Sequence, residues 1–181
     1  ACGKAGWSTS PGAVMTTSRE PGRAVLRPTW RHLADPVHCL ALGFGSGLAP
    51  VAPGTFGSLV GLAIALALAP LGLAWNLVAV AVAVGVGIRI CGESARRLGV
   101  HDHPAIVWDE VAGMMITMLA VPDAWWGAPL AFVLFRLFDI AKPWPIREID
   151  HGLGGGAGIM LDDVLAGLFA ALGLIVVGYV T

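Results

Sequence analysis

Charged residues are scarce in this sequence. They make up 13% of the 181 residues, whereas 56% are apolar, and the mean hydropathy is +0.77. Because soluble domains carry about 25% charged residues, this composition excludes an ordinary soluble protein and predicts a membrane protein. The 11 Lys and Arg are balanced by 12 Asp and Glu. The lack of excess positive charge argues against a nucleic-acid partner.

Cysteine is also scarce, with only three widely spaced residues and no Cys-x-x-Cys pair. Neither a disulfide framework nor a thiolate zinc site is therefore expected. Cys91 and Arg97 do have the Cys-x5-Arg spacing of cysteine-dependent phosphatases. That chemistry needs a loop of free backbone amides around the phosphate, whereas this segment follows a long apolar helix and carries the repelling charge of Glu93. We therefore expect no catalytic role for Cys91.

The first 32 residues lack the apolar core of a secretory signal. They contain Gly, Ser, Thr and Pro together with Lys4, Arg19, Arg23, Arg27 and Arg31. We expect residues 1–35 to be a flexible cytoplasmic tail and residues 36–181 to be a membrane-embedded domain.

Apolar stretches recur along the rest of the chain, separated by Pro, Gly or charged clusters. Their composition and length are typical of helices, and the last one approaches the roughly 20 residues that span a bilayer. They occupy about 55–69, 75–90, 106–121, 128–141 and 160–179. The sequence therefore predicts an all-α, polytopic membrane bundle with four to five short spans. The glycine-rich residues 43–54 are predicted to be irregular.

Basic residues predict the orientation of these spans. They follow the second and fourth stretches and are absent near Pro70 and from residues 122–127. The residues concerned are Arg89, Arg96, Arg97, Lys142 and Arg147. The positive-inside rule then puts the N-terminus in the cytoplasm. With five spans, every polar motif would lie on the cytoplasmic side.

Two acidic pairs begin the third and fifth stretches, Asp109 with Glu110 and Asp162 with Asp163. Two such pairs on neighbouring helices could present several carboxylates to one small volume. Hard oxygen ligands favour Mg²⁺ over zinc, so we predict that these four acids hold Mg²⁺. The alternative is that acids at helix N-termini only complement the helix dipole.

Small residues follow both acidic pairs at helical spacing. Gly113 and Thr117 share a face with Asp109. Gly167 and Ala170 or Ala171 share one with Asp163. Such stripes let helices approach closely in lipid. We expect them to bring the two acidic ends together.

The fourth stretch carries Arg136, Asp139 and Lys142 at a spacing of three, before Pro143 ends the helix. Charges within a short apolar helix are costly in a bilayer and indicate a functional site, although an internal ion pair that only sets packing is the alternative. Arg136 and Lys142 are suited to binding a phosphate.

Two further groups of residues are weaker candidates. Thr55 and Ser58 lie at an expected helix start after the glycine-rich run, where amides and hydroxyls can hold a phosphate, although the run could equally form a membrane turn. The triplet His101, Asp102 and His103 could supply a proton donor or a metal ligand. A capping or hydrogen-bonding role is the favoured interpretation of the triplet.

Four segments together resemble the successive motifs of the phosphatidylglycerophosphatase A family: GFGSGLAPVAPGTFGS, HDHPAIVWDEVAGM, FRLFDIAKPWPIREID and GGAGIMLDDVLAG. The resemblance covers about residues 38–178. It implies a magnesium-dependent enzyme of the bacterial cytoplasmic membrane that converts phosphatidylglycerol phosphate into phosphatidylglycerol. The acidic and basic motif residues of the family fall on Asp102, Asp109, Glu110, Arg136, Asp139, Lys142, Asp162 and Asp163.

For this reaction we expect Asp139, Asp163, Arg136 and Lys142 to be catalytic, with the two cations also binding the substrate phosphate beside Thr55 and Ser58. The attacking group is either a carboxylate or a metal-activated water, and the density of carboxylates favours water. An ion-coupled transporter and a lipid-binding subunit are the alternative functions. A transporter would place its acids near the membrane midplane, whereas these acids lie at the ends of spans.

Overall fold

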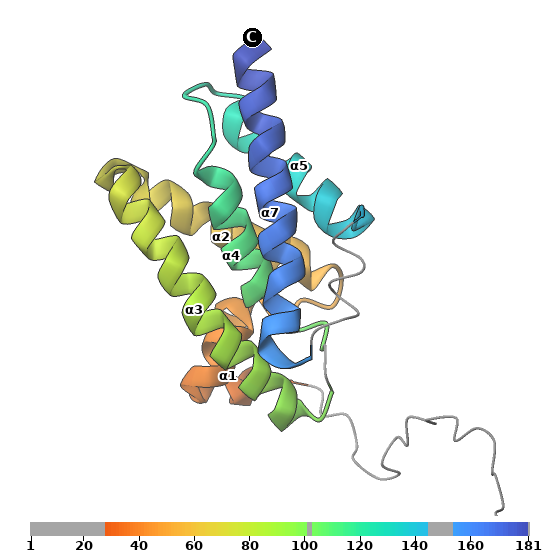
Figure 1. Ribbon diagram of the computed structural model, residues 1–181. Coiled ribbons are helices and arrows are strands. Elements are labelled where there is room, and N and C mark those ends of the chain that lie inside the picture. Colours follow the sequence, from red (N-terminus) through yellow and green to blue (C-terminus); the bar gives the residue numbers. More distant parts are fainter. Residues whose placement is uncertain (1–27, 101–102, 145–153, 181) are drawn as a thin grey trace, which may run out of the picture.

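The computed structural model describes residues 28–100, 103–144 and 154–180, and every regular element in these ranges is helical (Figure 1). The all-α prediction is therefore confirmed. Each predicted apolar stretch contributes one long helix: α2 (Pro53–Leu68), α3 (Leu73–Leu98), α4 (Trp108–Met118), α5 (Gly127–Ala141) and α7 (Gly155–Val180). The shorter elements are η1 (Trp30–Ala34), α1 (Pro36–Ala41), η2 (Gly43–Leu48) and η3 (Ala69–Leu71). Thus η1 forms within the segment that was assigned to the N-terminal tail, of which residues 1–27 lie outside the described part.

Among the described residues, three segments are long and apolar enough to cross a membrane: Pro53–Leu71, Leu73–Leu98 and Gly155–Tyr179. The other two long helices are shorter, with 11 residues in α4 and 15 in α5. At 1.5 Å per residue they measure about 16 and 22 Å, less than the roughly 30 Å of a hydrocarbon core. The expected total of four to five spans therefore stays a prediction.

The helix α3 continues two turns beyond the apolar stretch that predicted it and ends at Leu98, where Gly99 adopts a left-handed conformation with φ of 77°. Cys91 therefore lies inside a helix and is fully buried, with its Sγ 3.9 Å from Met160 Sδ. A buried helical thiol has no surrounding loop of free amides to hold a phosphate. The geometry thus agrees with the expectation that Cys91 is not a nucleophile.

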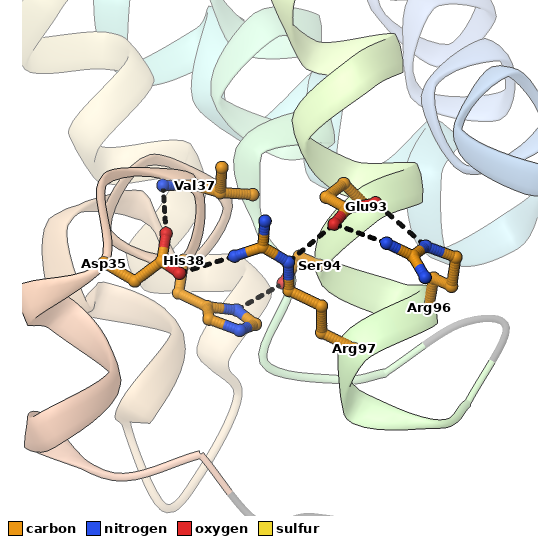
Figure 2. A network of polar contacts seen from close by, with 7 residues as sticks. All are labelled: Asp35, Val37, His38, Glu93, Ser94, Arg96 and Arg97. Carbon is orange, nitrogen blue, oxygen red and sulfur yellow. Dashed lines mark hydrogen bonds and ion pairs between the residues drawn. The ribbon is translucent and has the colours of Figure 1, made fainter.

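Polar contacts attach α1 to this last part of α3 (Figure 2). Asp35 caps α1 by accepting a hydrogen bond from the Val37 amide at 2.8 Å, and Arg97 forms ion pairs with both Asp35 and Glu93. His38 Nδ1 lies 2.9 Å from Ser94 Oγ. Burial lowers the pKa of His38 below its ordinary 6.5. The network anchors the segment that leads from α1 through η2 into α2.

Residues 43–54, predicted to be irregular, form η2, a bend and the start of α2, and include several left-handed residues. Phe44 has φ of 57° within η2, and Ala52, which precedes α2, has φ of 48°. Glycine is required where this segment meets the loop before α4, since a Cβ on Gly47 would lie 2.0 Å from the Ala105 carbonyl oxygen. These turns place the first residues of α2 against the N-terminal end of α4.

The helix α4 occupies the middle of the bundle, between α3 on one side and α7 and α5 on the other (Figure 1). It packs closely against α7, where a Cβ on Gly167 would lie 2.5 Å from the Gly113 carbonyl oxygen. Thr117 Oγ1 donates at 3.0 Å to Gly113 O and lies 3.3 Å from Gly167 O. This contact confirms the predicted small-residue stripes. It also sets Asp109 and Asp163, four residues before these glycines, beside one another.

Candidate active site

A polar cavity of about 340 Å³ lies where the first turns of α2 and α4 meet the last turn of α5 and the acidic residues of α7. Its wall contains five carboxylates and two cations, a formal excess of three negative charges. The lining residues are Ala52, Pro53, Gly54, Pro104, Ile106, Asp109, Glu110, Arg136, Asp139, Ile140, Lys142, Asp162 and Asp163. The structure thus brings the acids and bases of three separate sequence motifs into one site.

Three of the carboxylates form a compact group. One oxygen from each of Asp109, Glu110 and Asp163 lies within 4.8 Å of the other two, and Asp109 and Asp163 are only 8% and 3% exposed. Within the described part of the chain, Glu110 Oε2 and Asp163 Oδ1 are buried without a hydrogen-bond partner. Because unsatisfied buried carboxylate oxygens are costly, this group, called the triad below, fits a hard divalent cation such as Mg²⁺.

The other two carboxylates each hold a cation. Asp139 forms an ion pair with Arg136 one turn earlier on α5. Asp162 Oδ2 lies 2.6 Å from Lys142 Nζ. These side chains are largely buried, with Lys142 the most exposed at 30%. The structure therefore separates the acids of the triad from a second set that fixes the two bases.

This separation differs from the expectation for Asp162, which was predicted to be a metal ligand beside Asp163. Adjacent residues on a helix point about 100° apart. Asp163 therefore reaches the acids of α4, whereas Asp162 reaches the end of α5. Asp162 Oδ1 also accepts a hydrogen bond from the Asp163 amide at 3.0 Å. The two adjacent acids therefore have different partners: Asp163 lies with the acids of α4, and Asp162 pairs with Lys142.

Lys142 reaches Asp162 through an unusual backbone conformation. It is the C-cap of α5 and has φ of 39° and ψ of 61°, a left-handed region that costs a residue with a Cβ about 1–2 kcal/mol. Pro143 follows and disfavours the right-handed helical conformation for the residue before it. Local strain of this kind is characteristic of functional sites.

The first turn of α2 touches the site through Gly54, which is essential for the close packing there. A Cβ at this position would lie 2.2 Å from Glu110 Oε1 and 3.2 Å from Arg136 Nη1. Gly54 was not singled out from the sequence. The sequence signal that could have identified Gly54 as a site residue was its position directly before Thr55, at an expected helix start.

The two predicted hydroxyl ligands are placed differently from the expectation, since neither Thr55 nor Ser58 is among the described residues that line the cavity. Ser58 is fully buried. Its Oγ donates to the Gly54 carbonyl at 2.8 Å and lies 3.4 Å from Arg136 Nη1. Ser58 therefore contacts Arg136 without lining the cavity. It lies one helical turn after Gly54, which directs its hydroxyl toward α5.

The histidine-rich segment is only partly described, since His101 and Asp102 lie outside the described residues. His103 Nδ1 accepts a hydrogen bond from the Ala105 amide at 3.1 Å. This contact closes the turn before α4 and places Pro104 on the cavity wall. It is the local hydrogen-bonding role that was favoured for this triplet.

Comparisons with known proteins identify a family profile that matches most of the chain. The sequence profile of phosphatidylglycerophosphatase A matches residues 39–178, a range that contains every described lining residue. The chain is 45% identical over 150 residues to phosphatidylglycerophosphatase A of Escherichia coli, covering 81% of this chain and 86% of the relative. It is 46% identical over 149 residues to the protein of the same name from Haemophilus influenzae, covering 81% and 91%.

No solved structure matches the chain. The assignment therefore rests on the family profile and on the two relatives, which agree on one name and cover most of both chains. The chain belongs to the phosphatidylglycerophosphatase A family.

Proposed function

We propose that this protein removes the terminal phosphate of phosphatidylglycerol phosphate to give phosphatidylglycerol and inorganic phosphate. The names of the relatives support the substrate. The observation that carries the proposal is the cavity itself, in which a buried acidic triad lies beside two cations held by their own acids. A phosphomonoester needs both kinds of group, because its charge must be neutralised while its ester bond breaks.

In this proposal Asp109, Glu110 and Asp163 hold Mg²⁺. Magnesium bound there supplies Lewis-acid polarisation of the phosphate and lowers the pKa of a bound water. The formal charge of −3 on the lining residues supports a divalent cation, since a buried excess of negative charge is unfavourable without one. Ile106, which is almost fully buried, adds an apolar side chain to the same cavity wall.

Arg136 and Lys142 bind the phosphate oxygens in this proposal. Both are donors only, and the planar guanidinium matches two phosphate oxygens at once. Asp139 and Asp162 hold these cations in place before the substrate arrives, which reduces the reorganisation needed during the reaction. Asp139 thus contributes by positioning Arg136, and the attacking group is water rather than a carboxylate of the triad, whose oxygens are used for the metal.

We place this site on the cytoplasmic side of the bacterial inner membrane. The cavity is lined by the start of α2, the start of α4 and the end of α5. Gly92 near the end of α3 touches Gly156 at the start of α7, so the basic end of α3 lies at the beginning of α7. Lys142 and the arginines of α3 therefore support a cytoplasmic location by the positive-inside rule.

Phosphate release from defined lipids tests this function. The purified protein in detergent is expected to release phosphate from phosphatidylglycerol phosphate and to release it more slowly from phosphatidic acid, whose headgroup lacks the second glycerol. EDTA is expected to abolish release, and added Mg²⁺ to restore it. Binding of the lipid without phosphate release would favour a lipid-binding subunit instead. Full activity in EDTA would show that phosphate release does not require Mg²⁺.

Removal of the Ser58 hydroxyl is expected to weaken substrate binding more than turnover. Ser58→Ala removes the 3.4 Å contact to Arg136 Nη1 and leaves that nitrogen with its ion pair to Asp139, so we expect a several-fold rise in KM with a smaller change in kcat. The matched control is Ser46→Ala, since Ser46 Oγ is buried without a hydrogen-bond partner among the described residues and Ser46 is not one of those that line the cavity. An equal rise in KM for both variants would show that Ser58 does not position Arg136.

A further inference from the structure

One outer face of α5 is apolar and leads directly to the cavity. Val133, Leu137 and Ile140 follow one another at spacings of four and three residues, which places them on one side of the helix. They are 59%, 56% and 72% exposed. Ile140 also lines the cavity. These three residues, called the α5 stripe below, form a continuous apolar path from the side of the bundle to the polar site.

The opposite face of α5 is already occupied by protein. Ala131 and Phe135 are fully buried, and Phe138 packs against Phe169 of α7 with ring centroids 5.9 Å apart. The α5 stripe is therefore not needed to hold α5 in the bundle. Its exposure leaves it available to a ligand.

The same helix carries both cations of the cavity. Arg136 is adjacent to Leu137 in the chain, and Lys142 follows Ile140 by two residues. A ligand whose phosphate lies between these cations and whose apolar chain continues from it would meet the α5 stripe next. Only an amphipathic phosphate ester, such as a membrane lipid, matches both the charge and the apolar path.

Two exposed apolar residues on other helices lack this connection. Leu172 of α7 is 57% exposed and Val82 of α3 is 56% exposed. Neither is among the residues of the cavity wall. They have the exposure expected of any helix that faces lipid, whereas the α5 stripe combines that exposure with contact to the site.

We propose that the α5 stripe holds an acyl chain of the substrate lipid, which enters the cavity sideways from the bilayer past Ile140. This inference rests on the proposed lipid phosphatase function. Because lipid tails are about as apolar as leucine side chains, moving a chain from bilayer to stripe gains little hydrophobic free energy. The stripe therefore determines where the substrate lies more than how tightly it binds.

Photocrosslinking measures that position directly. A photoreactive p-benzoylphenylalanine is introduced separately as Leu137→p-benzoylphenylalanine and, for comparison, as Leu172→p-benzoylphenylalanine in the full chain. The proteins are placed in phosphatidylcholine vesicles with a trace of a labelled, non-hydrolysable phosphonate analogue of phosphatidylglycerol phosphate. Crosslinking at position 137 is expected to exceed that at position 172 several-fold. Unlabelled phosphonate lipid should remove the excess, whereas added phosphatidylcholine should not.

Equal labelling at the two positions, or labelling at 137 that the unlabelled analogue does not compete, would overturn the proposal. A second variant, Ile140→Trp, narrows the mouth of the path. It is expected to slow phosphate release from the long-chain lipid more than from its water-soluble deacylated form, whereas Leu172→Trp should alter neither. Equal effects of Ile140→Trp on both substrates would also overturn it. Failure of the proposed function itself would be distinct, since the unmodified protein would then release phosphate from neither substrate.

Discussion

The substitution Asp163→Asn is expected to abolish phosphatase activity while the protein without metal keeps or gains stability. Asp163 is 3% exposed and belongs to the triad. In the proposed magnesium site its neutralisation removes a ligand charge, and it also relieves repulsion among the remaining carboxylates. Loss of a direct ligand should cost more than the roughly 10- to 100-fold that loss of an outer-shell partner costs. The measurement is phosphate release set beside thermal unfolding with and without Mg²⁺.

The matched control for this experiment is the adjacent acid. Asp162→Asn makes the same chemical change one residue away, but Asp162 holds Lys142 and is not part of the triad. It should lower activity and still show stabilisation by Mg²⁺, as should Lys142→Ala. At a magnesium concentration about 100 times Kd, that stabilisation is about 2.7 kcal/mol. Equal magnesium-dependent stabilisation of Asp163→Asn and the unchanged protein would show that the triad is structural.

A methyl group at Gly167 is expected to separate the two helices that form the triad. In Gly167→Ala the new Cβ would meet the Gly113 carbonyl oxygen at 2.5 Å, and a backbone atom cannot rotate away. Such overpacking typically costs about 1–3 kcal/mol, more than the roughly 1 kcal/mol that alanine gains over glycine in a helix. Because α4 and α7 carry the triad, activity should fall together with the free energy of unfolding.

Gly173→Ala tests whether this effect belongs to the contact rather than to glycine in α7. A Cβ at Gly173 would meet only Leu134 Cδ1 at 3.5 Å, an ordinary van der Waals distance. This variant should be as stable as the unchanged protein or slightly more stable. If both variants unfold alike in a thermal melt, the close contact between α4 and α7 is not what stabilises the bundle.

The helical fold could be predicted from the sequence because its signals are local. Apolar stretches bounded by Pro, Gly and charge gave all five long helices, and the glycines after each acidic pair predicted the contact between α4 and α7. The end of α3 was missed by two turns. Its last residues are polar, so they lack an apolar signal, and their helix is supported instead by ion pairs of Glu93 with Arg96 and Arg97.

The site was harder to predict, since side-chain direction depends on how helices meet. The sequence identified the charged residues now found in one cavity, but it assigned both Asp162 and Asp163 to the metal. Their different partners follow from the position of Lys142 after a left-handed turn, which no spacing rule reveals. Ser58 was similarly placed near the phosphate, although its hydroxyl faces Arg136 and the Gly54 carbonyl.

The contact between α4 and α7 also bears on the biosynthesis of this protein. The triad takes two acids from α4 and one from α7, and the segment that forms α5 lies between them in the chain. During translation α4 emerges well before α7, so its two acids enter the membrane region without their third partner. The triad can form only after α7 has been inserted and packed against α4. A nascent chain that stalls before α7 would therefore contain most of the charged residues that line the cavity but would have no phosphatase activity.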